Sequence, residues 1–281
     1  MVWWQNLTGT EDEAFRHNST YLTCMAFSPE AMPDKRAGRV VAGSFDGSVI
    51  VWDIATQKLI IKLGVEIEGT GGWRVEKIRD RHEDTVTACA FHPVEGSERA
   101  VTASVDTTVK VWNTKWGNCV ATLKGHSASV NGCCFSHDGE LIYTASSDNT
   151  MREWMATAPF KCLSIIIGHY APVHNVAFAT SGKHLFSVSE DRTVRAWLKF
   201  TLPSEPGVNT PAARVGSQPF SVTSSNGRVT DWFQWRQVAL FASAHPMRCL
   251  AGSRSEEEEE VACGSSDGCI YLLRLMLPGD Y

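Results

Sequence analysis

"GHSASVNGCCFSHDGELIYTASSDNTMREW" occupies residues 125–154, and "GHYAPVHNVAFATSGKHLFSVSEDRTVRAW" occupies residues 168–197. The two stretches align without a gap, so their period is 43 residues. In both, an Asp lies 22 residues after the His, and a Trp lies 6 residues after the Asp. In the first stretch these residues are His126, Asp148 and Trp154. Alternating apolar residues flank each Asp, which predicts short strands paired across a turn.

The same spacing extends the pattern in both directions along the chain. Upstream, the three residue types recur as His17, Asp46 and Trp52 and as His82, Asp106 and Trp112. Downstream, His245 and Asp267 are again 22 residues apart, although a Leu stands in the Trp position. Residues 221–232, "SVTSSNGRVTDW", form a decayed unit that keeps the Trp but has Asn in place of Asp. The sequence therefore shows six units, of which four carry all three residues.

These repeats resemble those of the WD-repeat (β-transducin-like) family. The carrying segments include "GSFDGSVIVWD" at 43–53, "ASVDTTVKVWN" at 103–113 and "GSSDGCIYLL" at 264–273, besides the two long stretches. Together the matching segments cover most of residues 17–275. The resemblance implies an all-β fold, a WD-repeat β-propeller of four-stranded antiparallel blades.

The spacing also predicts how the blades divide the chain. We expect a single propeller domain over residues 1–281 with six blades visible, and a larger or seven-bladed array as the alternative. The expected blade units are 17–81, 82–125, 126–168, 169–200, 201–244 and 245–281. Residues 1–16 either close the ring or remain from a preceding blade, because Trp4 lies 13 residues before His17. The second reading is the hypothesis that further WD repeats lie upstream.

The resemblance implies a structural role for the recurring polar residues. In the family, a His, a Ser or Thr, the turn Asp and the Trp form one buried hydrogen-bond chain in each blade. By position, the four chains are His17, Ser44, Asp46 and Trp52; His82, Ser104, Asp106 and Trp112; His126, Ser146, Asp148 and Trp154; and His169, Ser189, Asp191 and Trp197. Because one Ser, His and Asp set recurs four times in register, we expect structural pairing and no catalytic residue.

Composition narrows the classes of function. The 281 residues carry a net charge of −5 and form no basic stripe, so nucleic-acid binding is not expected. The apolar runs are too short to span a bilayer. The nine cysteines form no CxxC pair or zinc-like cluster, so we expect no metal and no cofactor. Many unpaired thiols favour a reducing compartment, the cytoplasm or alternatively the nucleus.

The resemblance also implies where a partner docks, on the face formed by the turns that carry the Asp residues. The positions are the residue before each Asp and those three and five places after each His. The expected partner-binding residues are Leu22, Phe45, Thr85, Val105, Asn131, His174, Glu190, Arg248 and Leu250. An apolar patch rimmed by charged groups is typical of a protein or peptide interface.

Two functions from different classes follow. The favoured one is a non-catalytic protein-interaction module, either a scaffold subunit or the sensor end of a larger protein such as a nucleotide-binding signalling ATPase. The alternative is a propeller enzyme or a lectin-like protein that binds a small ligand, which would need converging acids or metal ligands. The chain contains no P-loop and no Gly-rich dinucleotide turn, so the first function is preferred.

Overall fold

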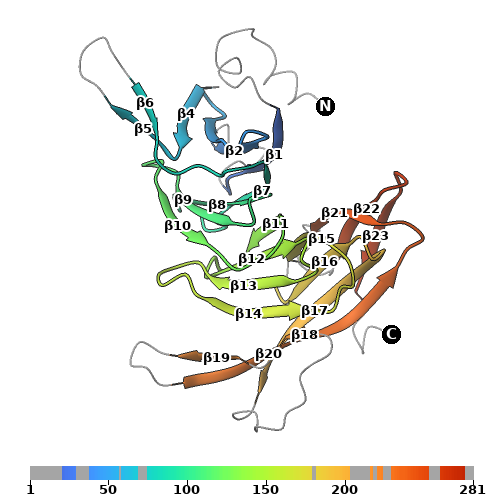
Figure 1. Ribbon diagram of the computed structural model, residues 1–281. Helices are drawn as coiled ribbons and strands as arrows, with labels where there is room; N and C mark the ends of the chain where they lie inside the picture. Colours follow the sequence, from blue (N-terminus) through green and yellow to red (C-terminus); the bar gives the residue numbers. More distant parts are fainter. Residues whose placement is uncertain are drawn as a thin grey trace. The chain divides into compact units, whose positions relative to one another are not determined.

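The computed structural model describes residues 21–29, 38–56, 58–68, 75–178, 182–202, 216–217, 220–223, 229–252 and 260–275. These residues form strands joined by turns (Figure 1). None of them belongs to a helix that is long and apolar enough to cross a membrane. The chain divides into two compact units, Met1–Lys124 and Gly125–Tyr281. Each unit is built from antiparallel sheets that are blades of a β-propeller.

Unit 1 contains two four-stranded blades. The strands of the first are β1 (Leu22–Phe27), β2 (Arg39–Ser44), β3 (Val49–Asp53) and β4 (Lys58–Leu63), in that order across the sheet. The second has β7 (Val86–Phe91), β8 (Arg99–Ser104), β9 (Val109–Asn113) and β10 (Cys119–Leu123). Between these blades in the sequence, β5 (Val65–Glu68) and β6 (Val75–Ile78) pair as a separate two-stranded antiparallel sheet.

Unit 2 contains three blades. The third blade has β11 (Val130–Phe135), β12 (Leu141–Ser146), β13 (Met151–Met155) and β14 (Cys162–Ile167), with β18 (Gly216–Ser217) added at its edge. The fourth has β15 (Val173–Phe178), β16 (His184–Ser189), β17 (Thr193–Leu202), β20 (Val229–Ala242) and β19 (Phe220–Thr223). The fifth has β21 (Met247–Gly252), β22 (Glu260–Ser265) and β23 (Ile270–Arg274).

The described residues thus form five blades, and the expected separate blade at 201–244 is wrong. Strand β20 pairs with β17 from Thr193–Ala242 to Leu202–Trp232, so it is the fourth strand of the fourth blade, with β19 paired along its other edge. The sequence predicted a blade here because Trp232 lies six residues after Asn226, the spacing of Asp and Trp in the other repeats. A blade needs an inner strand that follows a His, and this segment supplies none, so its hydrophobic residues extend the neighbouring sheets instead.

The turns between the second and third strands show why an Asp recurs in the repeats. In the third blade, Asp148 Oδ1 accepts hydrogen bonds from the backbone N of Thr150 at 3.0 Å and from its Oγ1 at 2.6 Å. Asn149, between them, has a φ of 69°. Thr107 and Arg192 have the same left-handed backbone in their blades, with φ of 71° and 69°. The Asp side chain closes the turn that forces this conformation on ordinary residues.

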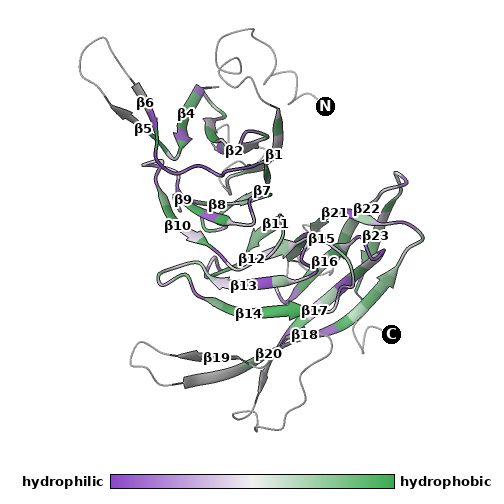
Figure 2. Ribbon diagram, viewed as in Figure 1, coloured by the Kyte–Doolittle hydropathy of each residue, from purple (hydrophilic) through white to green (hydrophobic). Residues whose placement is uncertain are grey.

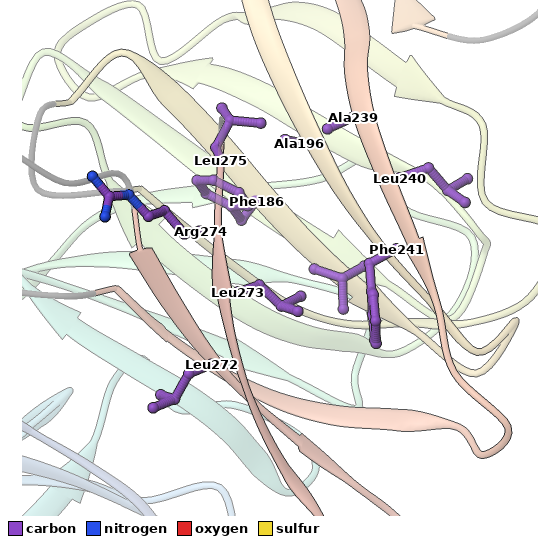
Figure 3. A pocket seen from close by; sticks show the side chains of 10 residues that line it. Phe186, Ala196, Ala239, Leu240, Phe241, Leu272, Leu273, Arg274 and Leu275 are labelled. Atoms are coloured by element: carbon purple, nitrogen blue, oxygen red, sulfur yellow. The ribbon is translucent and has the colours of Figure 1, made fainter. Parts of the chain in front are cut away.

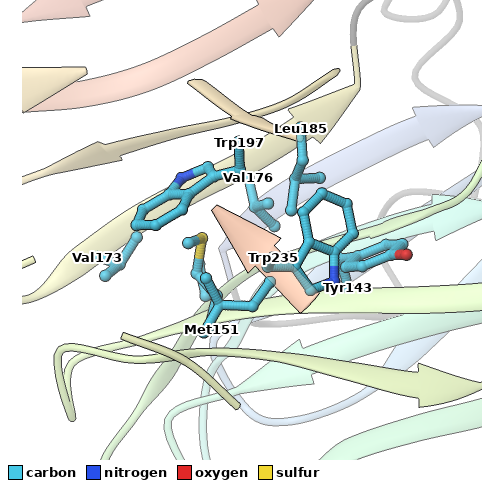
Figure 4. Close-up of a cluster of buried hydrophobic side chains, with 9 residues drawn as sticks. Tyr143, Met151, Val173, Val176, Leu185, Trp197 and Trp235 are labelled. Atoms are coloured by element: carbon cyan, nitrogen blue, oxygen red, sulfur yellow. The ribbon is translucent and has the colours of Figure 1, made fainter. Parts of the chain in front are cut away.

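The cores lie between successive blades within each unit. In unit 2, Tyr143, Trp197 and Trp235 are each at most 1% exposed and pack with the aliphatic residues of β13, β15 and β16 (Figure 4). In unit 1, Trp112 is fully buried beside Val41, Val51 and other residues of the first blade. The blades are therefore held together by large apolar side chains that are removed from water.

One charged residue lies inside the core of unit 2. Glu153 is fully buried in β13, where Figure 2 shows a polar segment. Its Oε1 accepts hydrogen bonds from Tyr143 Oη and Lys199 Nζ, both at 2.7 Å, and its Oε2 accepts one from Trp235 Nε1 at 3.0 Å. The equivalent residue of the first blade is Val51. Since Lys199 and Trp235 belong to the fourth blade, this carboxylate joins it to the third.

Candidate protein-interaction face

A buried hydrogen-bond chain closes the second blade. His82 Nδ1 lies 2.8 Å from Asp106 Oδ2, and His82 Nε2 lies 2.7 Å from Thr102 Oγ1. Trp112 Nε1 donates to the same Thr102 oxygen at 2.8 Å. The distances fit a ring that donates from Nδ1 to the carboxylate and accepts at Nε2 from the hydroxyl. Every side-chain polar atom of this hydrogen-bond chain then has a partner.

The third and fourth blades repeat this geometry. His126 lies 2.8 Å from both Asp148 and Thr144, and Trp154 Nε1 donates to Thr144 Oγ1 at 3.0 Å. The fourth blade has the same pairs, with distances of 2.8 Å for His169 to Asp191, 2.7 Å for His169 to Ser187 and 2.9 Å for Trp197 to Ser187. The chains are internal, and their buried hydroxyls and rings offer no accessible reacting group.

The hydroxyl of each chain is not the one that the sequence analysis chose. Ser104, Ser146 and Ser189 lie two residues further along the strand, where each accepts from the backbone N of the turn Asp at 3.1 Å. Their hydroxyls donate to carbonyls at the start of the first strand, as Ser44 does to Tyr21 O at 3.1 Å. Residues two positions apart on a strand face the same side, so spacing alone did not show which of the two hydroxyls belongs to the chain.

The first blade departs from the pattern. Ala42 occupies the position of Thr102, so this blade has no hydroxyl there. Asp46 still closes its turn by accepting from the backbone N of Ser48 at 3.0 Å, and Trp52 is buried. His17 lies outside the described residues.

The hydrogen-bonded pairing of His and Asp shifts the pKa values of these side chains. Burial alone would raise the pKa of Asp106, Asp148 and Asp191, but hydrogen bonds from the His rings and from the Thr two residues on outweigh it. The pKa of each Asp is therefore held well below its ordinary value. Burial lowers the pKa of His169, although Asp191 acts against this, so the ring stays neutral at pH 7.

These shifts predict acid lability of the fold. A pKa that is lower in the folded state stabilises the fold above the unfolded value and loses that contribution as the pH falls towards the folded value. The loss begins below about pH 6.5 for His169 and below about pH 4 for the three Asp residues. We expect the urea midpoint to decrease from pH 7 to pH 5 and more steeply below pH 4. Asp191→Asn should flatten the second decrease, and a midpoint that is constant from pH 7 to pH 3 would contradict the assignment.

One backbone hydrogen bond recurs in all five blades and defines the face above these chains. In each blade the residue before the turn Asp donates its N–H, at 2.9 Å, to a carbonyl just before the first strand. Each unit has its own ring-face residues, which are the donors, their acceptors and the second residues of the inner strands. In unit 1 they are Phe45, Val105, Tyr21, Thr85, Thr23 and Thr87, and in unit 2 they are Ser147, Glu190, Ser266, Ser129, Pro172, Pro246, Asn131, His174 and Arg248.

This register corrects one of the expected binding residues. Leu250 pairs with Cys263 in the position that Val176 has in β15, and it is buried at 8% exposure. Leu22 begins its strand opposite Ser44, as Val86 does opposite Ser104, but it is 40% exposed, so its binding role stays a prediction. The histidine spacing misplaced Leu250 because the inner strand begins two residues after His245 but four residues after His82, His126 and His169.

In unit 1 the ring face is apolar and aromatic. Phe45 is 61% exposed and Tyr21 is 85% exposed, and the backbones of the two residues are hydrogen-bonded. Thr85 Oγ1 donates to Phe45 O at 3.2 Å. Val105, whose backbone N donates to Thr85 O, is half-buried. Tyr21 was missed because it lies four residues after His17 and was not at an expected offset.

In unit 2 the ring face is polar. Glu190 Oε2 lies 2.7 Å from His174 Nε2 and accepts from Arg248 Nη1 at 2.8 Å, so these three predicted residues are brought together. Asn131 Nδ2 donates to Ser147 Oγ and to Val173 O, both at 2.9 Å. These bonds orient the side chains of the face before any partner arrives.

Unit 2 also contains an apolar cavity between its fourth and fifth blades (Figure 3). Its volume is about 250 Å³, and Phe186, Phe241, Leu273 and Leu275 are among its lining residues. The one charged group in the lining is Arg274, so the cavity has no acid or imidazole for catalysis. Among the described residues no three His, Cys, Asp or Glu side chains are placed to hold a metal ion.

Antiparallel blades, each built round a turn Asp and three of them closed by a buried His, hydroxyl and Trp chain, define a WD-repeat β-propeller protein. The family described as WD domain, G-beta repeat matches residues 12–53, 73–113, 117–154 and 160–197. The chain belongs to this family. A crystal structure of the WD40 β-propeller domain of Doa1 shares the fold, with a TM-score of 0.57 and 18% identity over 86% of this chain and 62% of that one.

Several curated proteins are similar over parts of the chain. Nuclear distribution protein PAC1 of Komagataella phaffii is 30% identical over 40% of this chain and 20% of its own length. Apoptotic protease-activating factor 1 of Rattus norvegicus is 33% identical over 42% of this chain and 8% of its own. DDB1- and CUL4-associated factor 13 of Homo sapiens is 31% identical over 28% and 18%. The chain thus spans a fifth or less of these relatives.

Proposed function

We propose that this chain is a non-catalytic protein-interaction scaffold or sensor module that binds a protein or peptide on its ring face. The observation that carries the proposal is Phe45, whose side chain is 61% exposed on a turn held by Asp46 and by the backbone of Tyr21. An aromatic side chain presented on a rigid turn loses little entropy on binding and buries a large apolar area.

The ring face offers two different chemistries to a partner. In unit 1, Phe45, Tyr21 and Val105 would receive apolar side chains. In unit 2, Arg248 and Glu190 would exchange their mutual ion pair for charged or polar groups of the partner. Since the charge of Arg248 is balanced by Glu190, the proposal includes no nucleic-acid partner and no membrane.

The proposal also places the protein in a cytoplasmic or nuclear complex. All nine cysteines are free thiols, which suits a reducing compartment. The name of the human relative describes it as associated with DDB1 and CUL4, and that relative is several times longer than the matched segment. We therefore propose that this propeller works as part of a larger protein or complex.

Substitution of the ring face tests the proposal. We expect Phe45→Glu to reduce recovery of the main bound proteins at least tenfold. This corresponds to a loss of about 1.4 kcal/mol or more of binding free energy, the effect of removing one central anchor residue. Quantitative mass spectrometry after affinity capture measures this loss. Trp116→Glu is the matched control, because Trp116 is 72% exposed on the turn that precedes β10 and lies away from the ring-face positions.

The companion variant Arg248→Glu reports on the face of unit 2. Both variants should unfold at the wild-type urea concentration, because exposed substitutions change stability little. A set of bound proteins that survives Phe45→Glu and Arg248→Glu but is lost in Trp116→Glu would overturn the proposed face.

A further inference from the structure

Two cysteines of unit 1 lie on β1 and β7, the neighbouring inner strands of its two blades. Cys24 lies in β1 and Cys89 in β7, and the interaction of the Cys24 thiol with that of Cys89 lowers the pKa of Cys24. Each sulfur also approaches a carbonyl of the other blade, with Cys24 Sγ 4.0 Å from Val86 O and Cys89 Sγ 3.6 Å from Val41 O. The strand register explains the meeting, because Cys24 pairs with Gly43 whereas Cys89 pairs with Thr102, one step further along its strand.

Packing holds Cys24 in this position. A Cβ added to Gly43 would lie 2.8 Å from Cys24 Sγ and 2.4 Å from Val86 Cγ1, so only glycine leaves room for the thiol there. Both cysteines are half-buried, which admits a small oxidant while the blades keep the sulfurs together.

The reactivity of the pair differs from that of the other thiols. The hydrogen bond from Cys89 lowers the pKa of Cys24, and this effect outweighs the opposing effect of burial. Burial instead raises the pKa of Cys134 and of Cys263 to about 12. Because the thiolate is the nucleophile, Cys24 is the better prepared of these three to react.

We propose that Cys24 and Cys89 form a reversible disulfide when the protein meets a peroxide, which joins the first blade covalently to the second. The Cys24 thiolate attacks one oxygen of hydrogen peroxide, giving a sulfenic acid and hydroxide, which takes up the proton that the Cys24 thiol released and becomes water. The Cys89 sulfur then attacks the Cys24 sulfur, the S–S bond forms, and water leaves with the Cys89 proton. The two thiols lose two electrons, and the peroxide is reduced to two water molecules.

Peptide mapping of the full chain tests this site directly. Trypsin releases Cys24 in the peptide of residues 17–35 and Cys89 in that of residues 82–99, and each peptide contains one cysteine. After hydrogen peroxide treatment of the dilute native protein and blocking of free thiols, we expect these two peptides to be linked, and dithiothreitol to separate them. The linked pair should exceed any other intramolecular pair at least tenfold.

Two variants complete the test. Cys24→Ser should abolish the link, whereas Cys119→Ser, which removes a half-buried thiol of β10 in the same unit, should leave its yield unchanged. Recovery of unlinked peptides from the wild type, at a peroxide dose that oxidises the exposed Cys249, would overturn the proposal. Since this readout needs no partner, its failure is distinct from failure of the proposed function.

Discussion

Glu153→Ala is expected to lower the free energy of unfolding by about 3 kcal/mol, the cost of breaking a buried ion pair. The substitution removes the acceptor of three donors, and Tyr143 and Trp235 are each 1% exposed. Without Glu153, their O–H and N–H groups lose their partner inside the core, and Lys199 Nζ loses its ion pair at 2.7 Å. The lysine side chain is 22% exposed and will recover some hydration, which places the estimate at the lower end of the usual range.

Urea unfolding monitored by tryptophan fluorescence measures this effect. Glu140→Ala is the matched control, because Glu140 is an exposed carboxylate of the same blade and should change stability by less than about 0.5 kcal/mol. Glu153→Gln keeps the hydrogen-bond acceptor and should fall between the two. Wild-type stability in Glu153→Ala would show that the carboxylate does not join the third and fourth blades.

Thr144→Val is expected to cost about 2 kcal/mol, because a methyl group replaces the hydroxyl at the centre of the third chain. Trp154 Nε1 and His126 Nε2 both depend on that oxygen, at 3.0 and 2.8 Å, and all three residues are buried. The shape is conserved, so the loss reports the unpaired polar groups rather than a cavity.

Two further variants isolate the hydroxyl in Thr144→Val. Thr144→Ser should retain most of the stability, since Ser187 fills the same position in the fourth blade. Thr157→Val, at an exposed position after β13, should have little effect. Equal stability of Thr144→Val and Thr157→Val would mean that the hydroxyl does not hold the chain together.

The residues that the sequence predicted best are those whose positions are tied to a turn. The Asp of each turn and the Trp six residues later are separated by a tight turn and one strand, which fixes their spacing, and in three blades both belong to one hydrogen-bond chain. The His lies before a loop of variable length. His245 therefore misplaced a ring-face position of its blade at Leu250.

Other features depend on contacts that spacing does not encode. Thr144 and Ser146 face the same side of one strand, and only the positions of His126 and Trp154 show which hydroxyl lies between them. Likewise β20 joins the fourth blade because its residues pair with β17 over ten positions, a long-range choice that competes with a local repeat. Glu153 follows Arg152 in its strand, and the local sequence does not indicate that its three donors come from β12, β17 and β20.

Hydrogen exchange of the indole N–H groups tests the central claim most directly, namely that the repeated His, hydroxyl and Trp residues form internal chains that close the blades. Trp112, Trp154 and Trp197 are at most 3% exposed and donate to a buried hydroxyl, whereas Trp116 is 72% exposed. In NMR spectra of the native protein, the three buried indole protons should exchange on the order of 1,000-fold more slowly than that of Trp116, because they open only with their blade. Exchange of the three at the rate of Trp116 would contradict the account.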